Sequence, residues 1–122
     1  MTEFKQDRAI YLQIAEQICD EILAKKYNTD DRIPSVREQA VQFEVNTNTI
    51  VKTYDLLLQQ GIIYTKRGLG YFVTTDATVR IKKSMTQKFM HEILPELFHQ
   101  MQLLDIPIET IIEQWKNIHD TE

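Results

Sequence analysis

The chain has 122 residues, of which 43% are hydrophobic and 26% are charged, and its formal net charge at neutral pH is −4. The length suits one compact domain with a small appendage, and the hydrophobic fraction excludes a globally disordered chain. Cys19 is the only cysteine, so an intrachain disulfide is excluded. The sequence shows neither a signal-peptide layout nor an apolar run of membrane-spanning length, so we expect a soluble cytoplasmic protein without membrane association.

Charge is distributed unevenly along the chain. Residues 1–31 carry a net charge of −3, residues 32–83 a net charge of +4, and residues 84–122 a net charge of −5. The acidic total by itself argues against a nucleic-acid partner. The basic middle segment nevertheless identifies one part of the chain that is suited to a polyanion.

Residues 9–26 are predicted to form an amphipathic helix. Its apolar side chains recur at helical spacing, at Tyr11, Ile14, Ala15, Ile18 and Ile22. Cys19 falls within this face, which favours a buried structural thiol over a reactive one. The following segment, YNTDDRIP at 27–34, has the composition of a loop.

A second, short helix is predicted after Pro34. Ser35 precedes Glu38 by three residues, which is the spacing of a capping box with Ser35 as the N-cap. The helix is expected to end near residues 43–44. The side chains that we expect to face inward are Val36, Ala40 and Val41.

The third predicted helix opens with four small polar residues, NTNT at 46–49. Asn46 is the N-cap candidate, and the helix is predicted to end at Gln60, where Gly61 supplies the left-handed residue that often follows a helix. One cap needs only one of the four polar side chains, so the others are available for another role. The apolar side of this helix consists of Ile50, Tyr54, Leu57 and Leu58.

A β-hairpin is predicted next. Residues 62–65 and 71–74 are rich in residues that favour strands, and the tip between them reads KRGLG at 66–70. The chain contains three glycines, and all three lie at or within this hairpin.

Two further helices are predicted in the C-terminal part. A long helix is expected from about Thr78 to about Leu104, with a kink or a break at Pro95 because proline cannot complete the helical hydrogen-bond pattern. A last helix is expected to start near Pro107. Apolar side chains line one face of each: Met85, Phe89, Ile93, Leu97 and Met101 on the first helix, with Met90, Leu94 and Phe98 beside them, and Ile108, Ile111, Ile112 and Trp115 on the second.

Three helices followed by a hairpin are typical of a winged helix-turn-helix, in which the N-terminal residues of the third helix meet base edges in the major groove. The predicted fold class is mainly α with a small β-hairpin: a winged helix-turn-helix DNA-binding domain at 1–75 and a two-helix dimerisation module at 76–122. Short polar side chains suit base edges, and basic ones suit phosphates. The predicted DNA-binding residues are Ser35, Arg37, Asn46, Thr47, Asn48, Thr49, Lys52, Lys66, Arg67 and Gly68.

Each of these residues also has a simpler explanation. The NTNT composition is common in loops and caps, Ser35 serves first as a cap, and basic side chains such as Arg37, Lys52 and the pair at 66–67 usually face solvent. Their joint placement in this order of elements favours DNA binding. A winged helix used only for protein contacts would open its third helix with apolar or acidic residues instead.

The segment IPSVREQAVQFEVNTNTIVKTYDLLLQQGIIYTKRGLGYFV resembles the signature of the GntR family of bacterial transcription regulators. That signature runs Leu-Pro-Ser-x-Arg-x-Leu-Ala, then a helix that begins near Asn-Thr-Val, then Leu-x-x-x-Gly-Leu-Ile and Gly-x-Gly-x-Phe-Val. The resemblance covers residues 8–75, including AIYLQIAEQICDEI near the start. The matching positions are Pro34, Ser35, Arg37, Ala40, Asn48, Thr49, Leu57, Gly61, Ile62, Gly68, Gly70, Phe72 and Val73.

Some positions depart from the signature. Ile33 and Gln39 stand where the family usually has leucine, and residues 46–47 are Asn-Thr where many members have Ser-Arg. The pattern Asn-x-Asn-Thr with Lys52 and Tyr54 is similar to the YtrA-like subfamily, and Tyr54 is expected to pack in the core or between domains rather than to contact DNA. The resemblance implies a homodimeric sequence-specific regulator that binds double-stranded operator DNA and represses an operon that includes transporter genes.

The broad apolar faces of the C-terminal helices cannot be buried within those helices alone. They either fold back on the winged domain or pair with the same helices of a second chain, and we favour the homodimer, which is also what the YtrA-like resemblance implies. An alternative is a ligand-gated regulator that senses a small molecule or drug between these helices. The predicted dimerisation residues are Met85, Phe89, Ile93, Leu97, Met101, Ile111 and Trp115.

Enzyme classes find little support in the sequence. His91 and His99 are eight residues apart, too far for a helical i, i+4 metal pair, and His119 lies still further along. We find neither a Cys-His nor a Ser-His-Asp arrangement, and no phosphate-binding glycine loop. The sequence therefore predicts a protein that is not an enzyme and that needs no cofactor or metal ion.

Overall fold

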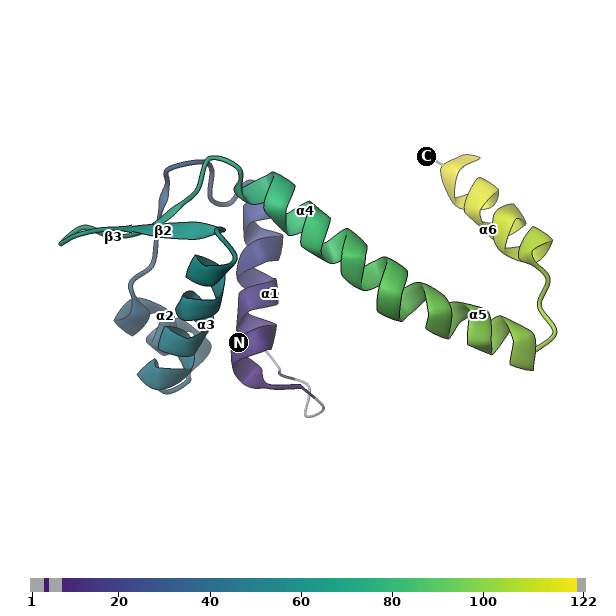
Figure 1. Cartoon of the computed structure of the whole chain (residues 1–122), viewed down its shortest axis with the longest axis horizontal. Coiled ribbons are helices and arrows are strands. Elements are labelled where there is room, and N and C mark those ends of the chain that lie inside the picture. Colours follow the sequence, from purple (N-terminus) through teal and green to yellow (C-terminus); the bar gives the residue numbers. More distant parts are fainter. Residues whose placement is uncertain (1–3, 5–7, 121–122) are drawn as a thin grey trace. The chain divides into compact units, whose positions relative to one another are not determined.

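The computed structural model describes residue 4 and residues 8–120, and its contacts divide the chain into two units, Met1–Lys83 and Ser84–Glu122. In the first unit, the β2–β3 hairpin extends away from three packed helices (Figure 1). The elements of this unit are α1 (Ile10–Leu23), β1 (Arg32–Ile33), α2 (Val36–Phe43), α3 (Thr47–Gln59), β2 (Ile63–Lys66), β3 (Gly70–Val73) and the first part of α4 (Ala77–Lys88).

The helices α1 and α3 supply most of the apolar core. The face predicted for α1 is confirmed by the burial of Ile14, Ala15, Ile18 and Ile22, whereas Tyr11 is half-buried. The face predicted for α3 is confirmed by Ile50, Tyr54 and Leu57, which are fully enclosed. The helix α1 ends at Leu23, before the predicted residue 26, because Lys25 adopts a left-handed backbone with φ of 69°.

The prediction that Val41 faces inward is wrong. Val41 is 74% exposed, and the buried residues of α2 are Gln39, Ala40 and Phe43. These residues lie at positions i, i+1 and i+4, which form one face of a short helix, and Val41 projects about 100° away from Ala40. The apolar character of Val41 therefore gave the wrong orientation, because polar Gln39 occupies the inward position.

The strands of this unit form a three-stranded antiparallel sheet. Its order is β1-β3-β2, with Arg32 opposite Phe72 and Tyr64 opposite Phe72 on the other side. The strand β1 was not predicted, and its residues were assigned to a loop, because a two-residue strand has no periodicity of its own. The two predicted strands of the hairpin exist, and each is displaced by one residue from the predicted bounds.

The connection from α3 to β2 turns at Gly61, as predicted. Its φ of 73° lies in the left-handed region, and a Cβ added there would lie 2.8 Å from Nη1 of Arg80. The Gly61 carbonyl accepts a hydrogen bond from the Thr74 hydroxyl at 2.7 Å. Gly61 thus serves both the backbone turn and the close approach of α4.

The start of α4 belongs to the core of the first unit. Ala77 and Ile81 are at most 2% exposed and pack in the same cluster as α1 and α3. The contacts therefore separate the two units between Lys83 and Ser84, whereas the sequence analysis drew its domain boundary after Thr75.

The C-terminal unit is entirely helical where it is described. The end of α4 continues through η1 (Phe89–Ile93), a π-helical turn, into α5 (Leu94–Leu103), and α6 (Ile108–Asp120) follows a short connection. A kink or a break was predicted at Pro95. The helix instead adapts one turn earlier, where the Leu94 amide donates to the Phe89 carbonyl five residues back, so Pro95 enters the first turn of α5, where an amide hydrogen is not needed.

The predicted fold class is confirmed: the chain is mainly helical, with one small antiparallel sheet. Within the described residues, none of the helices combines the length and the apolar character needed to cross a membrane.

Candidate nucleic-acid interface

The N-terminus of α2 is closed by a capping box, as predicted. The Ser35 hydroxyl accepts from the Glu38 amide at 3.1 Å, and the Glu38 carboxylate accepts from the Ser35 amide at 3.0 Å. Hydrogen bonding of the Glu38 carboxylate to the Ser35 amide and to the Ser35 side chain, with a smaller contribution from Arg32, holds the pKa of Glu38 below its ordinary value.

The N-terminus of α3 separates the cap from the other polar residues. The Asn46 side-chain oxygen accepts from the Asn48 amide at 2.8 Å, so Asn46 is the N-cap that the sequence predicted. The side chains of Thr47 and Asn48 are exposed, and Thr49 is half-buried. The first turn of α3 therefore presents short hydrogen-bonding groups to solvent, at the position that a recognition helix uses for base edges.

The two predicted basic residues of the helices differ in their surroundings. Arg37 is exposed in the first turn of α2. The Nζ of Lys52 lies 4.3 Å from the centroid of the Tyr11 ring, so this side chain folds back over α1. Its neighbour Thr53 also joins the two helices, because its hydroxyl donates to the Tyr11 carbonyl at 3.0 Å. Lys52 thus remains on the surface but does not extend straight out from α3.

The hairpin tip is a tight turn built on two glycines. Gly68 and Gly70 have φ values of 77° and 117°, and the Leu69 amide donates to the Lys66 carbonyl at 2.9 Å. Arg67 is exposed at the tip. The Nζ of Lys66 lies 4.8 Å from the Phe72 ring centroid, so its side chain covers the aromatic face of the hairpin. Of the predicted pair, Arg67 is therefore the better placed for a phosphate.

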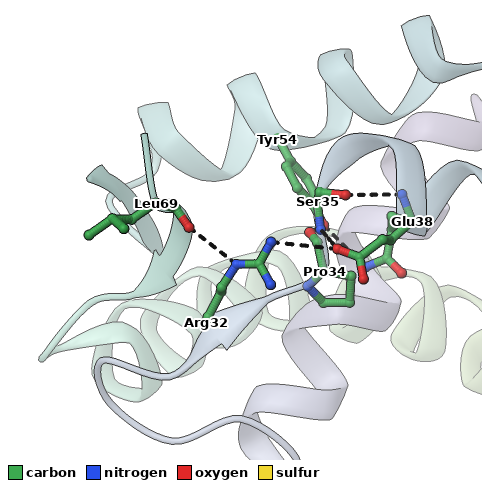
Figure 2. Close-up of polar contacts among 7 residues, drawn as sticks. Arg32, Pro34, Ser35, Glu38, Tyr54 and Leu69 are labelled. Carbon is green, nitrogen blue, oxygen red and sulfur yellow. Dashed lines mark hydrogen bonds and ion pairs between the residues drawn. The ribbon is translucent and has the colours of Figure 1, made fainter. Parts of the chain in front are cut away.

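Arg32 is a basic residue that the sequence analysis did not include in the site. Its Nε donates to the Leu69 carbonyl at 3.2 Å, and its Nη2 lies 3.6 Å from a carboxylate oxygen of Glu38 (Figure 2). Arg32 therefore connects the hairpin tip with the capped start of α2. The basic net charge of residues 32–83 was the only sequence signal for it.

Buried hydrogen bonds connect α3 with α2 and with the residue Pro34 just before α2. The Tyr54 hydroxyl donates to the Pro34 carbonyl at 2.6 Å and accepts from the Gln39 side-chain amide at 3.3 Å. Tyr54 is fully buried, as predicted, and burial raises the pKa of its hydroxyl well above the ordinary value. Gln39, which stands where the family signature has leucine, is therefore a buried polar residue whose side chain is hydrogen-bonded to Tyr54.

Val51 is a second residue that the sequence analysis did not consider. It lies four residues after Thr47 on α3 and is 43% exposed. Apolar side chains on a recognition helix contact the thymine methyl group. A search for polar groups alone misses such a residue, although the i, i+4 spacing from Thr47 identifies its face.

Most of the predicted dimerisation residues are exposed within the single chain. Met85, Phe89, Ile93, Leu97 and Trp115 are between 38% and 65% exposed. Ile111 is half-buried, and Met101 is buried. Met101 therefore supports the fold of its own unit, next to the connection between α5 and α6, and its side chain is not part of the exposed apolar face.

The described residues contain little that is typical of catalysis. Among residue 4 and residues 8–120, no group of three or more His, Cys, Asp or Glu side chains is placed to bind a metal ion. The Cys19 thiol is half-buried in α1, and burial raises its pKa to about 12, so the reactive thiolate form is rare at neutral pH.

Comparisons with known proteins agree with this geometry. Residues 10–73 match the model of the family described as bacterial regulatory proteins, gntR family. The chain is 38% identical over 111 residues to the uncharacterized HTH-type transcriptional regulator YhcF of Bacillus subtilis, which covers 91% of this chain and 90% of that protein. It is 34% identical over 110 residues to the HTH-type transcriptional repressor YtrA of the same organism, which covers 89% of this chain and 83% of that protein.

Solved structures show the same relationship. A transcriptional regulator of the GntR family from Bacteroides thetaiotaomicron has a TM-score of 0.80 and 41% identity, over 93% of this chain and 98% of that chain. AraR(DBD) in complex with operator ORR3 has a TM-score of 0.54 and 35% identity, over 61% of this chain and 87% of that chain. The resemblance read from the sequence is confirmed, and the chain belongs to the gntR family of bacterial regulatory proteins as a DNA-binding transcriptional regulator.

Proposed function

We propose that this protein is a homodimeric repressor that reads its operator with the first turn of α3. The proposal is based on the first turn of α3, where Asn46 caps the helix and the side chains of Thr47 and Asn48 are exposed to solvent. In the major groove, an asparagine side chain pairs with adenine, and a threonine contacts either base type. The complex of AraR(DBD) with its operator supports this use of the fold.

The test replaces Asn48 by alanine. The probe is a fluorescent duplex that the full-length protein selects from a random-sequence library, called here the selected duplex. Loss of a base contact should weaken binding by about 1–3 kcal/mol and relax the preference at one base pair. The matched control is Gln59→Ala, an exposed position at the other end of α3. Equal affinities of Asn48→Ala and wild type would exclude a base contact from this residue.

The phosphate contacts of the proposal come from Ser35, Arg37 and the hairpin tip. The tip residue Arg67 projects from a glycine-built turn and is suited to a phosphate or to the minor groove. Binding should therefore weaken steeply as salt increases.

The dimer of the proposal uses the apolar face of the C-terminal unit. Phe89, Ile93 and Trp115 are exposed in the single chain, and α6 has Ile108 and Ile112 exposed as well. Monomeric soluble proteins rarely expose contiguous apolar patches of this kind. A second copy of the same face covers it around a two-fold axis, and it presents two copies of α3 to a pseudo-palindromic site.

Light scattering of two variants tests the dimer. Ile93→Glu places a charge in the apolar face and should shift the mass toward the monomer. Glu92→Gln changes an exposed neighbour in the same turn and should leave the mass unchanged. A wild-type protein that is monomeric at all concentrations would contradict the dimer.

Repression of an operon with transporter genes completes the proposal. The similarity to the repressor YtrA supports the sign of the regulation, since the alignment covers most of both chains. A repressor of chromosomal genes acts in the cytoplasm, where the DNA is. Deletion of the gene should raise the transcripts of the operon that contains the selected sequence, and a fall in those transcripts would indicate an activator.

A small-molecule effector is a second candidate function of the C-terminal unit. Phe98, Met101 and Pro107 line an open hollow of about 600 Å³, together with Gln102, Asp105 and Ile106. Its volume is in the range of ligand pockets, and its lining combines apolar side chains with one carboxylate, that of Asp105, which suits a lipophilic cation. A thermal-shift screen with such compounds, using Asp105→Asn as the comparison, tests this candidate.

A further inference from the structure

Arg32 makes two contacts that join separate parts of the winged unit. From the edge strand β1, its Nε donates to the Leu69 carbonyl, 37 residues away, at 3.2 Å. Its Nη2 lies 3.6 Å from Oε1 of Glu38 in the first turn of α2. Figure 2 shows the guanidinium between the hairpin tip and the capped helix end.

The hairpin tip needs such a contact because its own bonds are few. Pairing between β2 and β3 ends at Lys66 and Gly70, and beyond this point the turn is closed by the Leu69 amide on the Lys66 carbonyl. The strand β1 pairs with β3 at Tyr71 and Phe72, so only the outer part of the hairpin is two-stranded, and a two-stranded ribbon is only marginally ordered on its own. Arg32 adds a third point of attachment from outside the ribbon.

The absence of a side chain at Gly70 leaves room for the Arg32 side chain beside the hairpin backbone. A Cβ added at Gly70 would lie 3.1 Å from Nε of Arg32. A larger residue would displace either the guanidinium or the strand. The glycine therefore lets Arg32 lie directly against the backbone of the tip.

The other end of the contact is rigid. Oε1 of Glu38 also accepts from the Ser35 amide at 3.0 Å, within the capping box of α2. The ion pair itself is weak, because both side chains are about half exposed to water. The hydrogen bond to the Leu69 carbonyl is thus the contact that restrains the tip, and Glu38 orients the guanidinium for it.

We propose that Arg32 is a positioning residue that holds the hairpin tip in register with the starts of α2 and α3, so that the tip and α3 engage DNA together. This inference rests on the proposed role of the tip in DNA binding. Arginine is required because its planar fork donates in two directions at once, toward Leu69 and toward Glu38. Lysine keeps the charge but cannot keep this geometry.

The first test measures the free full-length protein. Heteronuclear NOEs of the Arg67, Gly68 and Leu69 amides should fall in both Arg32→Ala and Arg32→Lys. The matched control is Arg80→Lys, since Arg80 is a half-exposed arginine that pairs with Asp76 away from the tip. Circular dichroism checks that each variant is folded. Unchanged NOEs at the tip in both Arg32 variants would overturn the proposal.

The second test is a double-mutant cycle on the selected duplex. Arg32→Ala and Arg32→Lys should each weaken binding by about 5- to 30-fold, the effect of losing one coupled contact. In the background of Lys66→Ala with Arg67→Ala, Arg32→Ala should have no further effect on affinity or on its salt dependence. An additive loss, with the slope against salt reduced by a further ~0.9, would mean that Arg32 contacts a phosphate itself and would overturn the proposal.

The two tests distinguish a failure of the positioning role of Arg32 from a failure of the proposed role of the hairpin tip in DNA binding. If Lys66→Ala with Arg67→Ala alone binds like wild type, the tip has no part in DNA binding, and the proposed function is then wrong at this point. The NOEs still decide whether Arg32 restrains the tip. Wild-type affinity of Arg32→Lys, with a functional tip, would show that charge alone suffices and would also overturn the positioning role.

Discussion

The two units of this chain differ in where their apolar side chains lie. In the first unit, Ile14, Ile50 and Val73, which come from three different elements, are buried in one cluster. In the C-terminal unit, Ile112 and Trp115 are exposed, although α6 is as regular an α-helix as α1. The first unit completes its own core, and the second leaves an apolar face uncovered.

The size of each unit explains this difference. Residues 1–83 supply three helices, a sheet and the start of α4, which together enclose a core. Residues 84–122 form a segment of the size, about 40 residues, below which folding usually needs a disulfide, a metal ion or an oligomeric partner. Helical regularity therefore does not by itself provide burial.

The largest expected effect comes from removing the C-terminal unit. A chain truncated after Lys83 should remain folded, become monomeric and bind the selected duplex about 10²–10⁴-fold more weakly, because the second half-site contact is no longer intramolecular. Light scattering and anisotropy titrations measure both effects. Equal affinity of the truncated and full-length proteins would mean that the apolar face has no role in DNA binding.

Shortening one isoleucine in each unit should give different kinds of loss. Ile18→Ala should lower the free energy of unfolding by about 2–5 kcal/mol at every protein concentration, because it leaves a cavity in a closed core. Ile93→Ala should lower the apparent stability in a way that depends on protein concentration, because it weakens association. Urea unfolding at several concentrations compares the two. Identical concentration dependence of the two variants would contradict the division into a self-contained and a dependent unit.

Loss of the Tyr54 hydroxyl should affect the first unit less than a cavity does. Tyr54→Phe leaves the Pro34 carbonyl and the Gln39 amide without their buried partner, which should cost about 1–3 kcal/mol of unfolding free energy. Adding Gln39→Leu removes one of the two unpaired groups and should recover part of the loss. A double variant that is less stable than Tyr54→Phe would show that Gln39 contributes through packing instead.

The smallest effect is expected at the capping box. Ser35→Ala should cost about 0.5–2 kcal/mol of unfolding free energy near neutral pH. Because the pKa of Glu38 is lowered below its ordinary 4.5, the stability that Glu38 adds is present above that value and is lost as pH falls through the lowered pKa. Urea unfolding above and below the ordinary pKa should therefore show a smaller pH dependence for Ser35→Ala than for wild type. Parallel pH profiles would mean that other carboxylates dominate.

The local elements were largely predictable from the sequence. The capping box of Ser35 and Glu38, the Asn46 cap and the left-handed Gly61 are all present in the structure. Each depends on residues at most four positions apart, so spacing alone identifies them. The inward orientation predicted for Val41 failed because an eight-residue helix contains too few turns to define its buried face.

The candidate site divides in the same way. The exposed polar turn at 46–49 and the glycine-built tip follow from residue order, and both were anticipated. The folded positions of Lys52 over Tyr11 and of Lys66 over Phe72 were not, because a cation–π contact depends on which ring lies nearby in space.

The order of elements, the caps, the turns and the family could be predicted, since they depend on local spacing and on a signature of neighbouring residues. The pairing of β1 with β3, the inward position of polar Gln39 next to Tyr54, and the contact of Arg32 with the Leu69 carbonyl became known from the folded structure. These contacts join residues that are far apart along the chain. Arg32 and Leu69 are 37 residues apart, and no local pattern encodes a contact that forms only when the sheet and the helices pack together.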